Sequence, residues 1–199
     1  ETAVVCDAVA TPLKIIKKAR ISSFDKVGVI GAGGGLGIHM LKMLKLNNIS
    51  AIGIDTKTEK FNTCNENGAE FSVSPMENDL KNKIADYSKN YDLDVVIDFV
   101  SSKSSLELGC SILGKGGRLV TLGGSGEQFL ANSAEMLVKE LELIGSRYCT
   151  KQELKESLDL YARGLIEPLV SVKTDFEGAE GLHDKIEKGE ITGRAGILI

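Results

Sequence analysis

The stretch VGVIGAGGGLGIHMLKMLKL, Val27 to Leu46, decides the fold. It begins with an apolar run, continues with five glycines in the seven residues from Gly31 to Gly37, and ends in apolar residues at helical spacing. A glycine turn between a buried strand and a helix leaves backbone N–H groups at the positive end of the helix open to a diphosphate. The pattern therefore predicts a phosphate-binding turn, whose candidate residues are Gly31, Gly33, Gly34, Gly35, Leu36 and Gly37. The alternative is a plain flexible turn before a helix.

A second signal is the acidic residue that ends the next apolar run. Asp55 closes AIGID, 18 residues after Gly37, near the spacing of about 20 expected for a carboxylate that accepts from an adenosine ribose. A carboxylate at this place repels a 2′-phosphate, so the sequence favours NAD over NADP. Lys57 and Lys60 keep NADP open as an alternative, and Lys60 could instead lie along the edge of the ribose.

Short apolar runs and helical patterns alternate along most of the chain. Strands that are apolar at every position are covered on both faces, as in parallel sheets. The alternation predicts an α/β fold with a doubly wound parallel sheet, a Rossmann fold. The expected strands are 27–30, 51–54, 95–97, 119–122 and 143–144, and the expected helices are 11–20, 36–46, 57–67, 80–87, 104–113, 154–161 and 179–186. We expect Thr11 to cap the first helix, with Pro12 as its first residue.

Two further segments follow strands and should lie at the same edge of the sheet as the glycine turn. Phe99, Val100 and Ser101 come after the fourth strand and could line a cofactor. Gly123 and Gly124 come after the fifth strand and could let a nicotinamide ring pass close to the backbone. For the two glycines the alternative is a plain turn.

The composition excludes several classes of function. Lys and Arg number 24 and Asp and Glu 28, for a net charge of −4, and no basic block indicates nucleic-acid binding. No apolar run is long enough to span a bilayer, and no signal peptide is recognisable, so we expect a cytoplasmic protein. The four cysteines form no CxxC motif, and Cys64 and Cys110 are expected to be ordinary buried thiols. His39 shares a polar stripe with Lys42 and Lys45 and is predicted to face solvent, as is His183.

Five segments together resemble the medium-chain, zinc-type alcohol dehydrogenase family: VGVIGAGGGLGIHMLKMLK, AIGIDTKTEK, DVVIDFVSSKSSL, GGRLVTLGG and GEITGRAGILI. The resemblance implies NAD as cofactor and hydride exchange between an alcohol and an aldehyde or ketone. It also implies ring contacts from Gly123, Gly124 and Tyr148, and a phosphate or ribose contact from Arg194. For Arg194 the alternative is a solvated side chain beside the last strand. In the family's terms, 1–23 is a linker strand and helix from the catalytic domain, 24–148 the NAD-binding domain, and 149–199 a C-terminal return to the catalytic domain.

The resemblance also raises the question of zinc, because the family's other metal ligands come mostly from an N-terminal GroES-like barrel. The family's third ligand lies 30 residues before the final glycine of the turn, a position that corresponds to Asp7. Cys6, one residue away, is an alternative ligand. A further alternative is that neither residue binds metal. We therefore expect zinc only in a longer chain that carries the barrel, and expect these 199 residues alone to bind cofactor without turning over substrate.

Two other functions stay open at this stage. One is a zinc-independent enoyl or quinone reductase of the same family, and the other is a non-catalytic nucleotide-sensing domain. The resemblance further implies a homodimer or homotetramer in which edge strands near Leu141 to Gly145 pair across a two-fold axis. Expected partners are small alcohol or carbonyl substrates.

Overall fold

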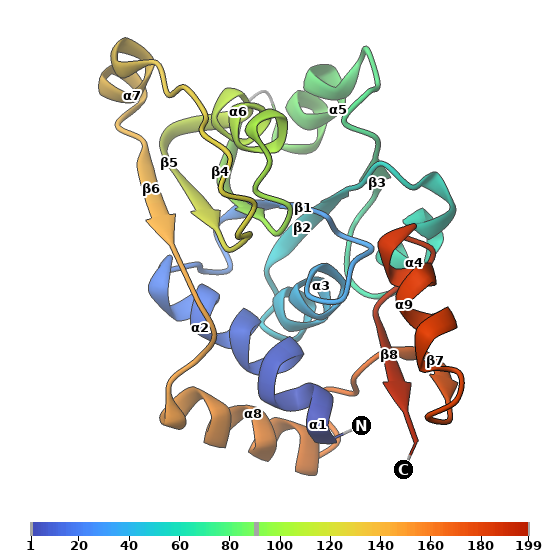
Figure 1. The fold of residues 1–199 in the computed structure, drawn as a ribbon. Coiled ribbons are helices and arrows are strands. Elements are labelled where there is room, and N and C mark those ends of the chain that lie inside the picture. Colours follow the sequence, from blue (N-terminus) through green and yellow to red (C-terminus); the bar gives the residue numbers. More distant parts are fainter. Residues whose placement is uncertain (1, 90–91, 199) are drawn as a thin grey trace.

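The computed structural model describes residues 2–89 and 92–198 and is built around one parallel sheet (Figure 1). Its six strands lie in the order β3-β2-β1-β4-β5-β6. The chain thus fills one half of the sheet outward from β1 and then returns to start the other half at β4. The strands of this sheet are β1 (Lys26–Ile30), β2 (Ser50–Ile54), β3 (Ser72–Val73), β4 (Leu93–Asp98), β5 (Leu113–Thr121) and β6 (Glu142–Gly145).

The register explains why the predicted site residues meet. Val27 of β1 lies opposite Ala51 of β2 on one side and Val95 of β4 on the other. All three strands run in parallel, so the turns that follow them open at the same edge of the sheet. Because the strand order reverses between β1 and β4, this edge holds the crevice in which open α/β sheets bind ligands.

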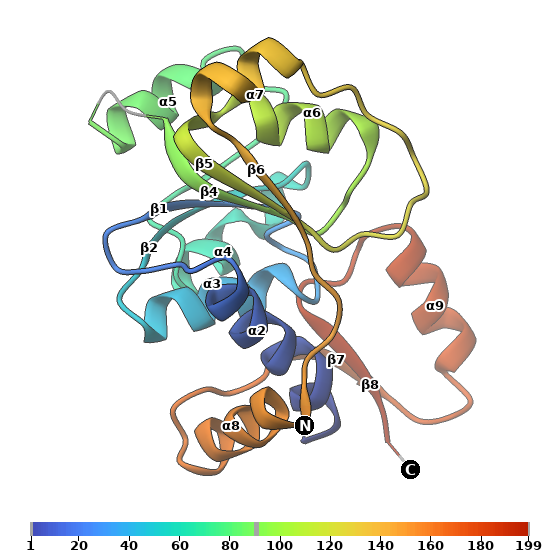
Figure 2. The same cartoon turned by 90° about the vertical axis from the view of Figure 1, so that its left-hand side faces the viewer.

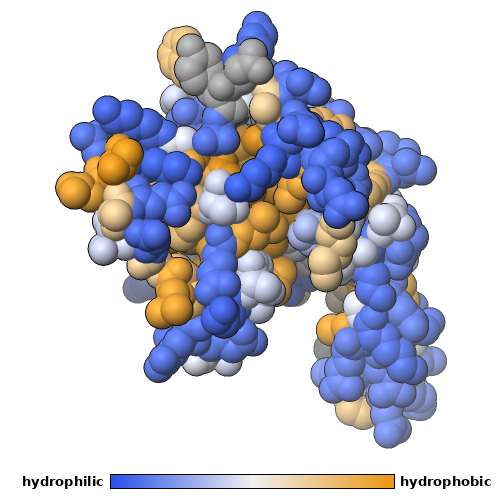
Figure 3. All heavy atoms as spheres, turned by 90° about the horizontal axis from the view of Figure 1, so that it is seen from above, coloured by the Kyte–Doolittle hydropathy of each residue, from blue (hydrophilic) through white to orange (hydrophobic). Residues whose placement is uncertain are grey.

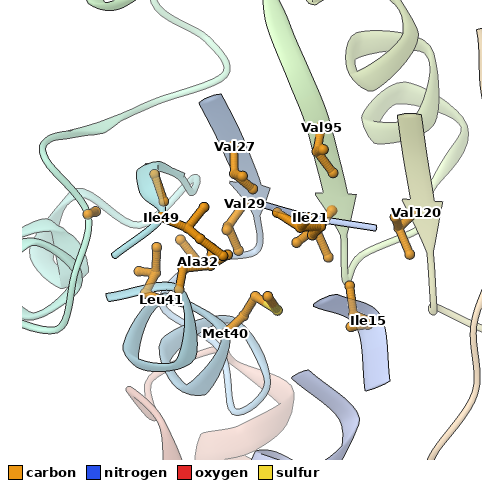
Figure 4. Packing of buried hydrophobic residues seen from close by; sticks show 14 of the residues in the cluster. Ile15, Ile21, Val27, Val29, Ala32, Met40, Leu41, Ile49, Val95 and Val120 are labelled. Carbon is orange, nitrogen blue, oxygen red and sulfur yellow. The ribbon is translucent and has the colours of Figure 1, made fainter. Parts of the chain in front are cut away.

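Helices cover both faces of the sheet (Figure 2). One face packs on α2 (Ala10–Lys18), α3 (Gly37–Leu46) and α4 (Phe61–Glu66), through a core that includes Ile15, Val29, Leu41 and Cys64. Figure 4 shows this core between the strands and α3. The other face packs on α5 (Leu80–Tyr87) and α6 (Lys103–Ser111), through Leu80, Ile84, Leu106 and Cys110. The doubly wound α/β prediction is confirmed.

The N-terminal segment differs from the prediction. Helical structure starts at α1 (Thr2–Val4), passes through the π-helical turn η1 (Val5–Val9) and continues into α2. Thr11 was expected as a cap, but it lies inside this helix and its hydroxyl donates to Asp7 Oδ1 at 3.3 Å. The apolar face extends backward through the buried Val5 and Val9, which explains the earlier start. Pro12 has no N–H to donate one turn back, and the turn before it is π-helical.

The C-terminal segment packs on the N-terminal helices and on the sheet edge. Its elements are α8 (Lys151–Ala162), β7 (Val170–Thr174), α9 (Ala179–Glu187) and β8 (Arg194–Ile197), and β7 and β8 form a second, two-stranded parallel sheet. Ile166 joins Val5, Val9 and Met43 in a third buried cluster. In Figure 3 the lobe at the lower right, which contains α9, presents mostly hydrophilic residues.

The remaining elements are the short 3-10 helix η2 (Thr58–Lys60) before α4 and the helix α7 (Ser133–Lys139) before β6. The sequence patterns did not predict β3, α7 or β7. Cys64 and Cys110 are buried as expected, and burial raises the pKa of the Cys64 thiol to about 11. Within the described residues, we find no helix with the length and apolar character that crossing a membrane requires.

Candidate cofactor site

The glycine turn is held tightly between β1 and α3. Gly31 has a left-handed φ of 76°, and its N–H donates to Ile54 O at 2.9 Å. A Cβ on Gly37 would lie 2.2 Å from Gly31 O and 2.7 Å from two backbone atoms of Ala32, so only glycine fits where α3 begins. The N–H groups of Gly35 and Leu36 donate to no other group in the described residues. They are therefore open donors at the N-terminal end of α3.

Asp55 follows β2 and is fixed by backbone donors. Its Oδ2 accepts from Gly33 N at 2.8 Å and its Oδ1 accepts from Lys57 N at 3.0 Å. The carboxylate stays partly exposed. Each carboxylate oxygen can accept a further hydrogen bond, so Asp55 is held beside the glycine turn with acceptor capacity left over.

Lys60 lies against the same turn, and its ammonium is bound by the C-terminal segment. The side chain is 6% exposed, and its methylene groups pack where a Cβ on Gly33 would be. The ammonium donates to Ile191 O at 2.7 Å. Lys60 thus links the second strand's turn to the C-terminal segment.

A pocket of about 680 Å³ opens at this edge. Most of the residues predicted to bind cofactor line it, namely Gly31, Gly34, Gly35, Leu36, Gly37, Asp55, Lys60, Phe99, Val100 and Arg194. Apolar lining also comes from Ile54, Pro75, Met76 and Leu108, which sequence reasoning did not single out. The segment around Pro75 has no periodic pattern of its own, and only the fold brings it to the pocket.

Gly123, Gly124 and Tyr148 line a second pocket of about 490 Å³, together with Asp7 and Thr121. Leu36 borders both pockets, so the two hollows adjoin across the glycine turn. Tyr148 is 60% exposed, with a left-handed φ of 46°. All but two of the predicted contacts therefore line one or the other of these two adjoining pockets.

The two exceptions are Gly33, which contacts Asp55, and Ser101, which is buried. Ser101 has a left-handed φ of 54°, and its hydroxyl accepts from Gly123 N at 2.8 Å. It thereby joins the turn after β4 to the turn after β5. The buried Asp98 supports this arrangement by accepting from the N–H groups of Val100 and Ser101 and from a serine hydroxyl. Asp98 ends an apolar strand, a signal that sequence reasoning passed over.

Arg194 begins β8, and its side chain lies over the glycine turn. A Cβ on Gly35 would be 2.7 Å from its Nε. One guanidinium nitrogen pairs with Asp7 Oδ2 at 2.5 Å. Arg194 is therefore held beside the turn and partly exposed to the pocket, with a carboxylate fixing its direction.

The residues described do not assemble a zinc site. Asp7 has its carboxylate engaged by Arg194 and Thr11, and Cys6 is exposed. No group of three or more His, Cys, Asp or Glu side chains with metal-binding placement occurs in 2–89 and 92–198. Asp7 and Cys6 as metal ligands stay predictions.

The prediction that His39 faces solvent is wrong, because His39 is fully buried. The C-terminal segment packs on the face of α3 that the local pattern marked as polar. Burial lowers the pKa of His39 to about 4; the Gly35 carbonyl opposes this, and the positive charges of Arg194 and Lys42 add to it. His183, in contrast, is exposed as predicted.

The strand order, the glycine turn after β1 and the acidic residue after β2 define a Rossmann-type domain. A family profile described as "Zinc-binding dehydrogenase" matches residues 35–163. The chain belongs to this zinc-binding dehydrogenase family.

Individual relatives and solved structures agree with this assignment. An NAD-dependent alcohol dehydrogenase from Sulfurisphaera tokodaii is 26% identical over 190 residues, which cover 95% of this chain and 54% of that protein. The crystal structure of the Aeropyrum pernix alcohol dehydrogenase matches with a TM-score of 0.89 and 27% identity, over 98% of this chain and 56% of that one. Acetophenone reductase from Geotrichum candidum, solved in complex with NAD, matches with a TM-score of 0.82 and 28% identity, over 97% of this chain and 54% of that one. The chain thus spans about half the length of the relatives it matches.

Proposed function

We propose that this chain is the NAD-binding part of an alcohol dehydrogenase-type oxidoreductase, which transfers hydride between an alcohol and NAD. The observation that carries the proposal is the crevice at the reversal point of the sheet. There the open N–H groups of Gly35 and Leu36 lie near a fixed carboxylate, Asp55. Two of the relatives are named NAD-dependent alcohol dehydrogenases, which supports the proposal.

Each group in the crevice has a role in this proposal. The N–H groups at the start of α3 and the guanidinium of Arg194 would bind the diphosphate. Asp55 would accept from the adenosine ribose hydroxyls, and the apolar wall that includes Met76 would contact the adenine. Gly123 and Gly124 would let the nicotinamide approach the backbone. NAD supplies the hydride acceptor, and an alcohol that loses one hydride and one proton becomes an aldehyde or ketone.

The residue ranges of the proposed parts are 1–23, 24–148 and 149–199. The six-stranded sheet lies between Lys26 and Gly145, which supports the middle range. The last range supplies Arg194 and the carbonyl that binds Lys60, so it completes the cofactor crevice rather than lying apart from it.

We also propose that the protein forms a homodimer, or a homotetramer built from such dimers, through the edge strand β6. Within the described residues β6 pairs on one side only, with β5, and Leu143 is 43% exposed. Next to it, Leu137 and Val138 of α7 are 78% and 73% exposed, and hydrophobic atoms protrude in this region at the left edge of Figure 3. An exposed edge strand beside apolar side chains favours pairing with a second copy. A cytoplasmic location stays our proposal, and the four free cysteines support it.

The proposal is tested by titrating the 199-residue chain with NADH and, separately, with NADPH, following the nicotinamide fluorescence. We expect NADH to bind at one site per chain and NADPH at least tenfold more weakly, because Asp55 repels a 2′-phosphate. Equal affinities would contradict the cofactor assignment. The reaction class is tested separately, on a longer chain that carries the N-terminal barrel, by NADH formation from primary and secondary alcohols with zinc present. Reduction of activated carbon–carbon double bonds without oxidation of any alcohol would favour the reductase alternative.

A further inference from the structure

His39 makes two hydrogen bonds that determine its chemical form. Its Nε2 lies 3.0 Å from the backbone N of Leu169, and its Nδ1 lies 2.7 Å from Gly35 O. A backbone N–H can only donate, so Nε2 is the acceptor. Nδ1 therefore carries the proton and donates to the Gly35 carbonyl. The imidazole is neutral in this arrangement, because a proton on Nε2 would face the Leu169 N–H.

The hydrogen bond from Nδ1 to Gly35 O fixes a peptide of the glycine turn. In a trans peptide the C=O and the following N–H point in opposite directions. When His39 holds the carbonyl of Gly35, the N–H of Leu36 is directed away from the imidazole, and Leu36 borders both pockets. This is one of the two open donors that the proposed function assigns to the diphosphate.

The hydrogen bond from Leu169 N to Nε2 fixes the segment that carries Arg194. The carbonyl of Leu169 accepts from Arg194 N at 2.9 Å, while its N–H is held by His39. A further bond joins Gly193 N to Gly33 O at 3.2 Å. The same imidazole thus touches both parts of the crevice that would contact a diphosphate, the turn and the strand behind the guanidinium.

On the basis of the proposed function, we propose that His39 is a positioning residue for the diphosphate of the cofactor, which it supports by joining the glycine turn to Leu169 and Arg194. It does not contact the ligand itself. Its complete burial excludes water from both hydrogen bonds. The charged groups that face it are Arg194, Lys42 and Asp7, and the low pKa that burial gives the imidazole keeps it neutral through the physiological range.

The two bonds can be separated by substitution. Asparagine places an amide N–H near the position of Nδ1, so His39→Asn can still donate to Gly35 O. Glutamine places an amide oxygen near the position of Nε2, so His39→Gln can still accept from Leu169 N–H. His39→Leu fills the space and makes neither bond. His183→Asn, at the exposed histidine of α9, is the matched control.

The experiment measures dissociation constants of ADP-ribose, which contains the diphosphate, and of adenosine, which has no phosphate. We expect His39→Leu to weaken ADP-ribose binding tenfold or more and adenosine binding less than twofold. His39→Asn should recover part of the loss, because it keeps the Gly35 peptide in place. His183→Asn should match the wild type. If His39→Leu does not fold, as judged by circular dichroism, the Asn and Gln variants carry the same comparison.

The outcomes distinguish this inference from the function on which it rests. If the wild type binds ADP-ribose and the His39 variants bind it equally well, the positioning role is overturned and the cofactor assignment stands. If ADP-ribose and adenosine weaken by the same factor, His39 supports only the general fold and the role is again overturned. If the wild-type chain does not bind ADP-ribose, both the proposed function and this inference fail.

Discussion

Replacing Gly37 by alanine should disrupt the contact between β1 and α3 that forms the glycine turn. The added Cβ would lie 2.2 Å from Gly31 O and 2.7 Å from the Cα and O of Ala32. All three are backbone atoms, so no side-chain rotation relieves the overlap. Overpacking typically costs about 1–3 kcal/mol, and we place this site at the upper end, at about 3 kcal/mol. For a chain of this length, that loss lowers the Tm by about 6–12 °C.

The control is the same substitution at Gly181, which lies in α9, where an added Cβ would meet no atom within 4 Å apart from its chain neighbours and the helix's own backbone. Alanine is the better helix former, so Gly181→Ala should raise the free energy of unfolding by up to about 1 kcal/mol. Both variants are measured by urea unfolding followed by circular dichroism. Unfolding free energies of Gly37→Ala and the wild type within about 0.5 kcal/mol of each other would refute the close-packing argument.

Three further predictions concern binding, pH dependence and association. Asp55→Ala should weaken NAD binding by about 1–3 kcal/mol, the loss of a hydrogen bond to a charged group; calorimetric titration checks this, and an unchanged affinity would remove Asp55 from the site. The pKa of His39 is lowered from 6.5 in the unfolded chain to about 4 in the folded one. As the pH falls, the unfolded chain therefore takes up this proton before the folded chain does. The contribution of the neutral His39 to stability is complete above pH 6.5 and is lost as the pH falls toward 4. The stability advantage of the wild type over His39→Asn should shrink by about 3 kcal/mol across that range, and a constant difference in urea unfolding would contradict the neutral buried imidazole. Leu143→Lys on β6 should convert dimers to monomers in sedimentation velocity, and a wild type that is monomeric at micromolar concentration would contradict association through this edge.

The parts of the fold that depend on local patterns were predictable from the sequence. The strand, glycine turn and helix from Val27 to Leu46 are contiguous, and Asp55 ends the next buried run. Parallel strands bring these segments to one edge, because the covalent order and the right-handed crossover leave few other arrangements. The predicted crevice follows from these constraints.

The roles of His39 and Lys60 were not predictable in this way. Both side chains are buried by the C-terminal segment, and their partners Leu169 and Ile191 lie 130 and 131 residues away in sequence. A polar stripe on a helix indicates a solvent-exposed face only if no other segment packs against it. The local sequence does not show whether a distant segment does so. Asp98 was missed for a related reason, since its partners are loop N–H groups whose positions depend on the fold.

The most direct test of the central claim is a crystal structure of the 199-residue chain with NAD bound. The account predicts the diphosphate against the N–H groups of Gly35 and Leu36, ribose hydroxyls donating to Asp55, and the nicotinamide beside Gly123 and Gly124. NAD bound away from the glycine turn, or an Asp55 carboxylate without contact to the ribose, would contradict it.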